Sequence, residues 1–181
     1  MDDGVLTGER IYLRPIRKED ALQLAEASHL EEEIGLHEDG RVPLSVLSFE
    51  SWIGGLSENE VVFAVCRHGD DRCIGTVSIR NIDRANGTAE TGSGLLHRED
   101  RGQGLGTEAK RLALDYAFET LGLHVLSSTV FEGNFRSARA LEKQGYRFAG
   151  RLTANVLGAG GVIGDTLMFD ITRDDWERLK G

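Results

Sequence analysis

The chain has 181 residues, 40% hydrophobic and 28% charged, which predicts one compact domain spanning residues 1–181. No apolar run approaches the roughly 20 residues that span a bilayer, and the acidic start Met1 to Gly4 lacks the features of a signal peptide, so we expect a cytoplasmic protein without a membrane partner. The net charge of −9 argues against a nucleic-acid partner and is compatible with a cationic one.

The first predicted element is a strand. Residues 10–14 alternate polar and apolar side chains, and Pro15 closes the run. Apolar residues among charged ones predict a short amphipathic helix over 18–28 and a second helix over 48–56. Between these helices, the acidic stretch 31–39 is expected to form a loop.

Three strands follow in the middle of the chain. Residues 61–66 form a nearly continuous apolar run, which is typical of a strand buried on both faces. Residues 73–82 alternate after a turn, and Asn86-Gly87 is a strong hairpin signal that leads into a strand over 88–96.

The two cysteines, Cys66 and Cys73, fall in the first two of these strands. Their number and spacing fit neither a disulfide framework nor a metal-ligand cluster. We therefore expect small, buried, apolar side chains in a reducing cytoplasm, and no metal.

The C-terminal half alternates helices and strands. Its clearest element is a helix over 105–121, whose apolar residues recur at helical spacing while its charged residues, Lys110 among them, fall largely on the other side. The remaining elements are a strand over 125–131, a helix over 135–144 that Gly145 could end in the left-handed conformation, and strands over 146–152 and 166–172 joined by the Gly-rich segment 158–161. This pattern indicates an α+β or mixed α/β sheet.

The most informative stretch is Arg101-Gly102-Gln103-Gly104-Leu105-Gly106, between a predicted strand and the helix over 105–121. Glycines let backbone N–H groups approach a ligand, and a helix N-terminus adds positive potential, so this turn is a candidate pyrophosphate site. A flexible strand-to-helix turn is the alternative. The Walker pattern is excluded because Thr107-Glu108 follow, and the Rossmann pattern because the glycines alternate.

The spacing R-x-x-G-x-G at Arg101, Gly104 and Gly106 resembles the pyrophosphate-binding signature of the GNAT acetyltransferase superfamily. Segments in the same order along nearly the whole chain resemble its RimJ/RimL-like branch: Leu6–Pro15, Ala89–Gly92, Asn134–Ser137, Glu142–Tyr146, Gly164–Phe169 and Asp174–Trp176. The resemblance implies one GNAT-like α+β domain. It would hold a twisted, mostly antiparallel sheet of about seven strands, splayed between the fourth and fifth, and about four flanking helices.

The resemblance also implies the donor site, with acetyl-CoA as co-substrate and no metal. The pantetheine would lie in the splayed gap, held by backbone groups of Leu95 and Leu96. Backbone N–H groups of the turn would hold the pyrophosphate, at Arg101, Gly102, Gln103, Gly104, Leu105 and Gly106. Asn134 would contact the pantetheine or order a water, a role compatible with capping the next helix.

The implied chemistry is direct attack of a neutral amine on the thioester within a ternary complex. A base must take the amine's proton, because an ammonium has no lone pair, and an acid should protonate the leaving thiolate. The resemblance nominates Glu90 as base, through a water, and Ser137 as acid. Glu90 could instead be an exposed strand carboxylate, and Ser137 could only bond its own helix turn. Tyr146 is better explained as a core residue.

The acceptor is the least determined part. We expect a primary amine, either a protein N-terminus or a small cationic molecule, and the oligomeric state stays open, a homodimer included. Candidate substrate contacts are Glu31, Glu32, Glu33 and His37 in the acidic stretch, and Ser93, where the branch often has aromatic residues. The alternatives are another acyl donor such as succinyl-CoA, served by Arg136 or Arg139, and an inactive CoA-sensing or protein-interaction module.

Overall fold

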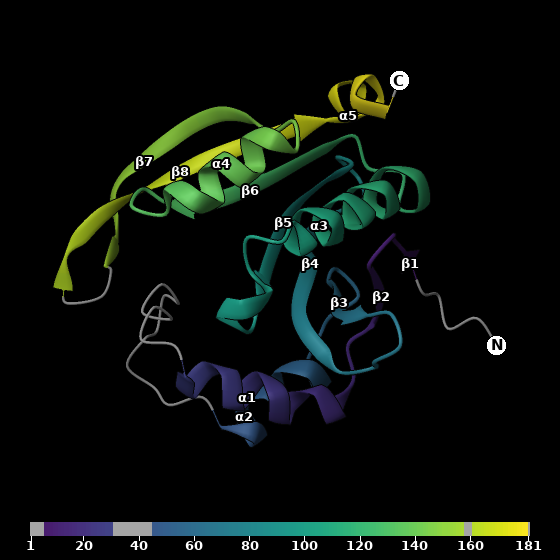
Figure 1. Ribbon diagram of the computed structural model, residues 1–181. Coiled ribbons are helices and arrows are strands. Elements are labelled where there is room, and N and C mark those ends of the chain that lie inside the picture. The colour runs from purple at the N-terminus through teal and green to yellow at the C-terminus, as the bar shows by residue number, and fades with distance from the viewer. Residues whose placement is uncertain (1–5, 31–44, 158–160, 181) are drawn as a thin grey trace.

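The computed structural model describes residues 6–30, 45–157 and 161–180 (Figure 1). Its strands are β1 (Leu6–Thr7), β2 (Ile11–Pro15), β3 (Val61–Arg67), β4 (Cys73–Asp83), β5 (Thr88–Leu95), β6 (Val125–Phe131), β7 (Arg147–Leu157) and β8 (Ile163–Thr172). Its α-helices are α1 (Ala21–Leu30), α2 (Val46–Gly54), α3 (Leu105–Asp115), α4 (Phe135–Lys143) and α5 (Arg173–Lys180).

All eight described strands belong to one sheet, in the order β1-β2-β3-β4-β5-β6-β8-β7. Every neighbouring pair is antiparallel except β5 with β6. The expected α+β architecture is therefore confirmed. The described residues add the short strand β1 and the helix α5 to the elements that the sequence predicted.

Most element bounds agree with the sequence pattern, and the differences have local causes. α2 begins at Val46, because the Ser45 hydroxyl accepts a hydrogen bond from the Ser48 N–H and caps the helix. The helix expected over 105–121 ends as an α-helix at Asp115 and continues as a π-helical turn over Tyr116–Thr120. β7 and β8 are longer than expected because they pair as a long hairpin. The expected acidic loop, residues 31–39, lies outside the described residues.

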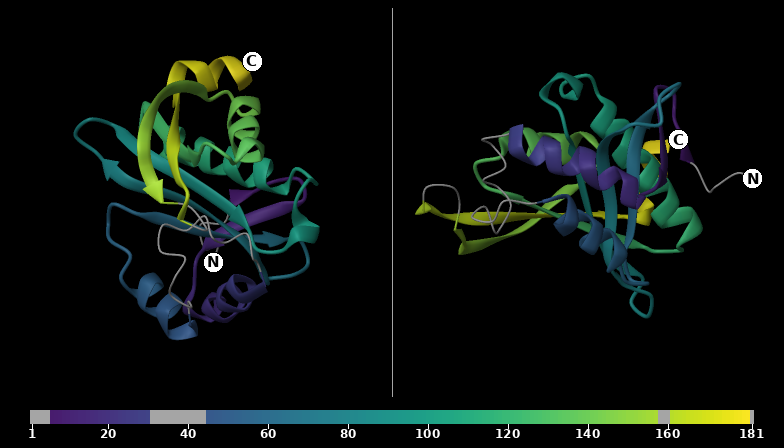
Figure 2. Two further views of the ribbon diagram at one scale, coloured as in Figure 1. Left: turned by 90° about the vertical axis from the view of Figure 1, so that its left-hand side faces the viewer. Right: turned by 90° about the horizontal axis from the view of Figure 1, so that it is seen from below.

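The helices are divided between the two sides of the sheet. α3 and α4 cover one face, whereas α1 and α2 lie on the other side, next to β2–β4 (Figures 1 and 2). Consequently β3 is buried on both faces, as its apolar run predicted. Cys66 and Cys73 are partners in the β3–β4 register and are both buried free thiols. Burial raises the pKa of Cys73 to about 12, so this thiol is unreactive at neutral pH.

One charged side chain lies among the apolar residues between α3 and the sheet. Lys110 is only 2% exposed, so the expectation that it faces away from the core was wrong. Its Nζ lies over the ring of Tyr146, 5.6 Å from the centroid. In the described part of the chain it has no hydrogen bond or ion pair. Burial, and secondarily the charge of Arg80, lower the pKa of Lys110 to about 7.

This burial predicts a pH-dependent cost to stability. Lys110→Met should raise the free energy of unfolding by roughly 2–4 kcal/mol at pH 6, where the wild-type amine is charged in both the folded and unfolded states. Between pH 7 and 10 the folded amine is neutral and the unfolded one still binds a proton. Wild-type stability therefore rises with pH, and the difference between the proteins should shrink.

Urea unfolding of both proteins across this pH range measures the effect. Arg111→Met is the matched control, because Arg111 is the exposed neighbour on the same helix and its loss should change stability little. A Lys110→Met protein less stable than wild type at every pH would contradict the prediction.

Candidate active site

β5 and β6 pair over only three residues each. Thr88–Glu90 pair with Val125–Ser127, although β5 continues to Leu95 and β6 to Phe131. Two side-chain hydrogen bonds follow the last pair: Thr91 Oγ1 to the Ser127 carbonyl (3.1 Å) and Ser128 Oγ to the Thr91 carbonyl (2.8 Å). Beyond them the strands diverge (Figure 1), which confirms the expected splay.

The divergence turns backbone groups of β5 toward the gap. In an antiparallel pair, alternate residues direct N–H and C=O toward the partner and the others away from it. The Leu96 N–H donates to the Ile74 carbonyl on the β4 side (2.9 Å), whereas the Thr91 carbonyl accepts from the β6 side. By this alternation Ser93 and Leu95 face the gap. We therefore no longer expect the backbone N–H of Leu96 to hold the pantetheine, because it is already bonded to β4.

The Gly-rich turn joins β5 to α3. Gly102 and Gly104 have φ of 75° and 81°, in the left-handed region that residues with a Cβ rarely adopt. Gly104 is the N-cap of α3, so the N–H groups of Leu105 and Gly106 have no carbonyl partner within the helix. Arg101 ties the turn to the gap, because its guanidinium donates to the Leu95 carbonyl (3.0 Å). The arrangement suits an anion bound next to the gap.

Arg10 and Glu108 hold this turn from the outside. The Glu108 carboxylate accepts from the N–H of Arg10 (2.8 Å) and from its guanidinium (3.1 Å). Arg10 also donates to the Gln103 carbonyl (2.6 Å), so the N–H of the same trans peptide, on Gly104, points the other way. Burial opposes ionisation of Glu108, but the bonds from Arg10 outweigh it and lower the carboxyl's pKa. The charged pair thus fixes the turn's orientation.

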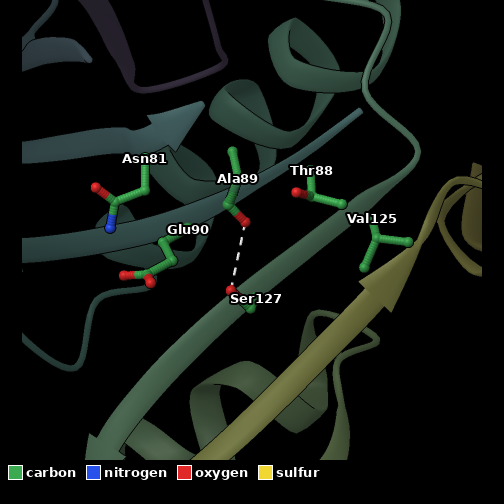
Figure 3. A pocket seen from close by; sticks show the side chains of 6 residues that line it. All are labelled: Asn81, Thr88, Ala89, Glu90, Val125 and Ser127. Carbon is green, nitrogen blue, oxygen red and sulfur yellow. Dashed lines mark hydrogen bonds between the residues drawn. The ribbon is translucent and has the colours of Figure 1, made fainter. Parts of the chain in front are cut away.

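Glu90 is the last β5 residue paired with β6. Its neighbours Ala89 and Thr91 are buried on the α3 face, so by strand alternation Glu90 projects from the opposite face. A hollow of about 190 Å³ lies there, lined by Asn81, Thr88, Ala89, Glu90, Val125 and Ser127 (Figure 3). Within the described residues the Glu90 carboxylate has no hydrogen-bond or ion-pair partner.

Asn81 brings a second polar side chain to this hollow (Figure 3). It has a φ of 51°, unusual for a residue other than glycine, at the irregularity of β4 between Arg80 and Asp83. Such strained backbone recurs at functional sites. An amide and a carboxylate at one hollow could hold a water between them.

Asn134 and Ser137 begin α4. Asn134 Oδ1 accepts from the Ser137 N–H (3.1 Å), so Asn134 is the N-cap. The Ser137 hydroxyl has no hydrogen-bond partner among the described residues. α4 lies on the α3 side of the sheet, packed through Leu141, so Ser137 and Glu90 approach from opposite faces. Tyr146, 3% exposed, is a core residue as expected.

Three further charged residues lie in this part of the molecule, two placed by strand register and one by the rotation of α3. Arg80 is the β4 partner of Glu90, and its Nη2 lies 3.6 Å from the position that a Cβ on Gly92 would take. Asp170 is the β8 partner of Ser127. Lys110 lies on the opposite face. The sequence pattern missed all three, because strand register and helix rotation alone place them here.

Among the expected substrate contacts, Ser93 is exposed at the gap, and the others, Glu31, Glu32, Glu33 and His37, lie outside the described residues.

Within the described residues, no helix is long and apolar enough to cross a membrane, and no three His, Cys, Asp or Glu side chains gather as metal ligands.

Comparison with known proteins agrees with this geometry. A family model described as an acetyltransferase (GNAT) domain matches residues 10–147. The "Probable N-acetyltransferase YjcK" of Bacillus subtilis (strain 168) is 33% identical, over 96% of this chain and all of that protein. Mycobacterium smegmatis RimJ in complex with CoA-disulfide superposes with a TM-score of 0.81 at 25% identity, covering 97% of this chain and 90% of that one. A GCN5-related N-acetyltransferase from Brucella melitensis gives 0.80 at 26%, covering 99% and 83%.

Proposed function

The chain belongs to the GNAT acetyltransferase family, and on that premise we propose that it transfers acetyl from acetyl-CoA to a primary amine. The observation that carries the proposal is the continuity of two features. The open edge of β5 at Ser93 and Leu95 leads directly into the Gly-rich turn at the start of α3. A pantetheine with its amides against β5 and a pyrophosphate at the helix N-terminus would occupy both together. The RimJ relative holds a CoA derivative on the same fold, which supports the donor assignment.

We place the reacting groups on the two faces of the sheet. Glu90, in the hollow away from α3, takes the amine's proton through a water. The N–H groups on the open edge of β5 stabilise the tetrahedral oxyanion. Ser137 donates a hydrogen bond to the leaving sulfur from the α4 side. Asn134, which already caps α4 through its Oδ1, has its amide N–H₂ left for the pantetheine or a water.

The acceptor in this proposal approaches the hollow from the face opposite α3. Glu90 and Asp170 flank Ser127 on that face, and Arg80, the β4 partner of Glu90, adds one positive charge beside them. The net negative charge of the three favours an amine that carries positive charge. A protein N-terminus and a small cationic amine both satisfy this condition. The proposal also includes two further parts: the chain belongs to the RimJ/RimL-like branch of the family, and its acyl donor is acetyl-CoA.

A panel of acceptors tests the function. CoA release from acetyl-CoA, succinyl-CoA and propionyl-CoA would be measured against polyamines, amino acids and peptides with varied N-termini, and acylated products identified by mass spectrometry. The proposal expects acetylated amine and CoA in equal amounts. CoA binding without turnover on any acceptor would instead identify an inactive CoA-sensing module.

Gly104→Val should weaken CoA binding at least tenfold, because its side chain would crowd the turn where the pyrophosphate lies. The Cβ alone would already stand 3.2 Å from Arg10 Nη2. Valine at a φ of 81° is also strained, so Gly122→Val, at a φ of 70° beyond α3, is the matched control. Calorimetric titration with CoA compares both variants after their folding is verified. Unchanged affinity in folded Gly104→Val would refute a pyrophosphate at this turn.

Glu90→Gln and Ser137→Ala should lower turnover without weakening CoA binding. A base and a leaving-group donor act on the transition state, and each loss should lower kcat by about 10²-fold. Glu58→Gln, an exposed carboxylate before β3, serves as the control for charge. Wild-type kcat in either variant on the identified acceptor removes that residue from the mechanism.

A further inference from the structure

Lys110 is 2% exposed, yet its amine is not among the fully sealed unpartnered atoms. The described side-chain atoms sealed from water without a hydrogen-bond partner are Gln23 Oε1, Asp100 Oδ2 and Gln144 Oε1, and Lys110 Nζ is not one of them. Because this amine has no hydrogen-bond partner either, it retains a small accessible surface.

The neighbours of the amine connect it to the apex of the β5–β6 gap. Nζ lies over the ring of Tyr146, and the Tyr146 hydroxyl is 2.6 Å from Thr91 Oγ1. Thr91 is the first β5 residue beyond the last pair with β6, and it bonds the Ser127 carbonyl. Lys110 therefore lies, on the α3 side, against the ring whose hydroxyl bonds the residue at which the strands part.

A structural role explains this lysine poorly. Packing against Tyr146 could be supplied by methionine, which has a similar shape and no charge to desolvate. The amine also lacks the carboxylate partner that most buried lysines have. Its pKa of about 7 leaves it divided between two protonation states at neutral pH, a property typical of acids and bases in catalysis.

We propose that Lys110 is the acid of the reaction, whose ammonium gives its proton to the sulfur of CoA as the thioester breaks. The inference rests on the proposed function, and it adds that the sulfur of the bound thioester lies at this apex. Ser137 then donates a hydrogen bond to the sulfur, since a serine hydroxyl does not release its proton near neutral pH.

The step balances without a further reactant. The amine nitrogen bonds to the acyl carbon and loses its proton through water to Glu90. The C–S bond breaks, and its electron pair takes a proton from Lys110 Nζ. The products are an amide and the CoA thiol, with Lys110 neutral and Glu90 protonated. Exchange with water after product release restores both groups.

The surroundings determine the pH dependence. Arg80 on β4 is the charged group whose field reaches the amine, and Tyr146, after α4, is the titratable ring beneath it. Thr91 on β5 is uncharged, and Glu90 projects from the other face. Lys110 therefore carries its proton below about pH 7 and loses it above, so its contribution to catalysis should decline as pH rises.

The kinetic test compares wild type with Lys110→Met, Lys110→Arg and the control Arg111→Met. We expect Lys110→Met to lower kcat about 10²-fold. The ratio of wild-type to Lys110→Met kcat/KM cancels the titration of the acceptor amine, and it should fall about tenfold per pH unit above pH 7. Arginine keeps the charge but cannot release a proton, so it should not rescue kcat. A ratio that does not change with pH, or rescue by arginine, would overturn the proposal.

A binding test separates this inference from the proposed function. An ammonium beside the sulfur should donate a hydrogen bond to it. Wild type should therefore bind CoA several-fold more tightly than desulfo-CoA near pH 6, and less so near pH 7.5, where most of the amine has lost its proton. Lys110→Met should lose this preference, and Arg111→Met should keep it. If wild type binds neither compound, both proposals fail. If both proteins bind CoA with the same preference at each pH, only the role of Lys110 fails.

Discussion

The site depends on the early end of pairing between β5 and β6. After Glu90 and Ser127 the two strands separate, although both continue in extended conformation. Strand edges inside a sheet normally satisfy each other's N–H and C=O groups, so the separation leaves donors and acceptors that water or a ligand must satisfy. Gly92 and Gly94 keep this length of β5 free of bulk. The Gly-rich turn and the charged side chains of the site are positioned around this open edge.

Two arginines align the remaining donors with this edge. Arg101 bonds the Leu95 carbonyl from within the turn, and Arg10, paired with Glu108, bonds the Gln103 carbonyl from outside. The N-terminus of α3 is thereby fixed relative to β5. A ligand with an anionic end and an amide-bearing arm meets preorganised groups at both positions, which lowers the entropic cost of binding.

Charge is distributed differently on the two faces of the sheet at the gap. Glu90, Asp170 and Arg80 project from the face with the hollow, whereas Lys110 lies against Tyr146 on the α3 side. In the proposed reaction this asymmetry lets a proton leave the amine on one side while another reaches the sulfur on the other. The buried amine lowers stability in return for a titrating group near neutral pH.

The sequence by itself determined the order and type of nearly all elements, the Gly-rich turn at a helix start, and the family with its candidate pair Glu90 and Ser137. Local periodicity and motif spacing carry that information. Only the tertiary structure decided that Ser93 rather than Leu96 joins Leu95 at the gap, that Arg80 and Asp170 lie beside Glu90 and Ser127, and that Lys110 turns inward. The physical reason is that pairing between distant segments sets strand register, and a shift of one residue along a strand exchanges its two faces. For Lys110 the reason is the rotation of α3 against the sheet, which tertiary packing sets.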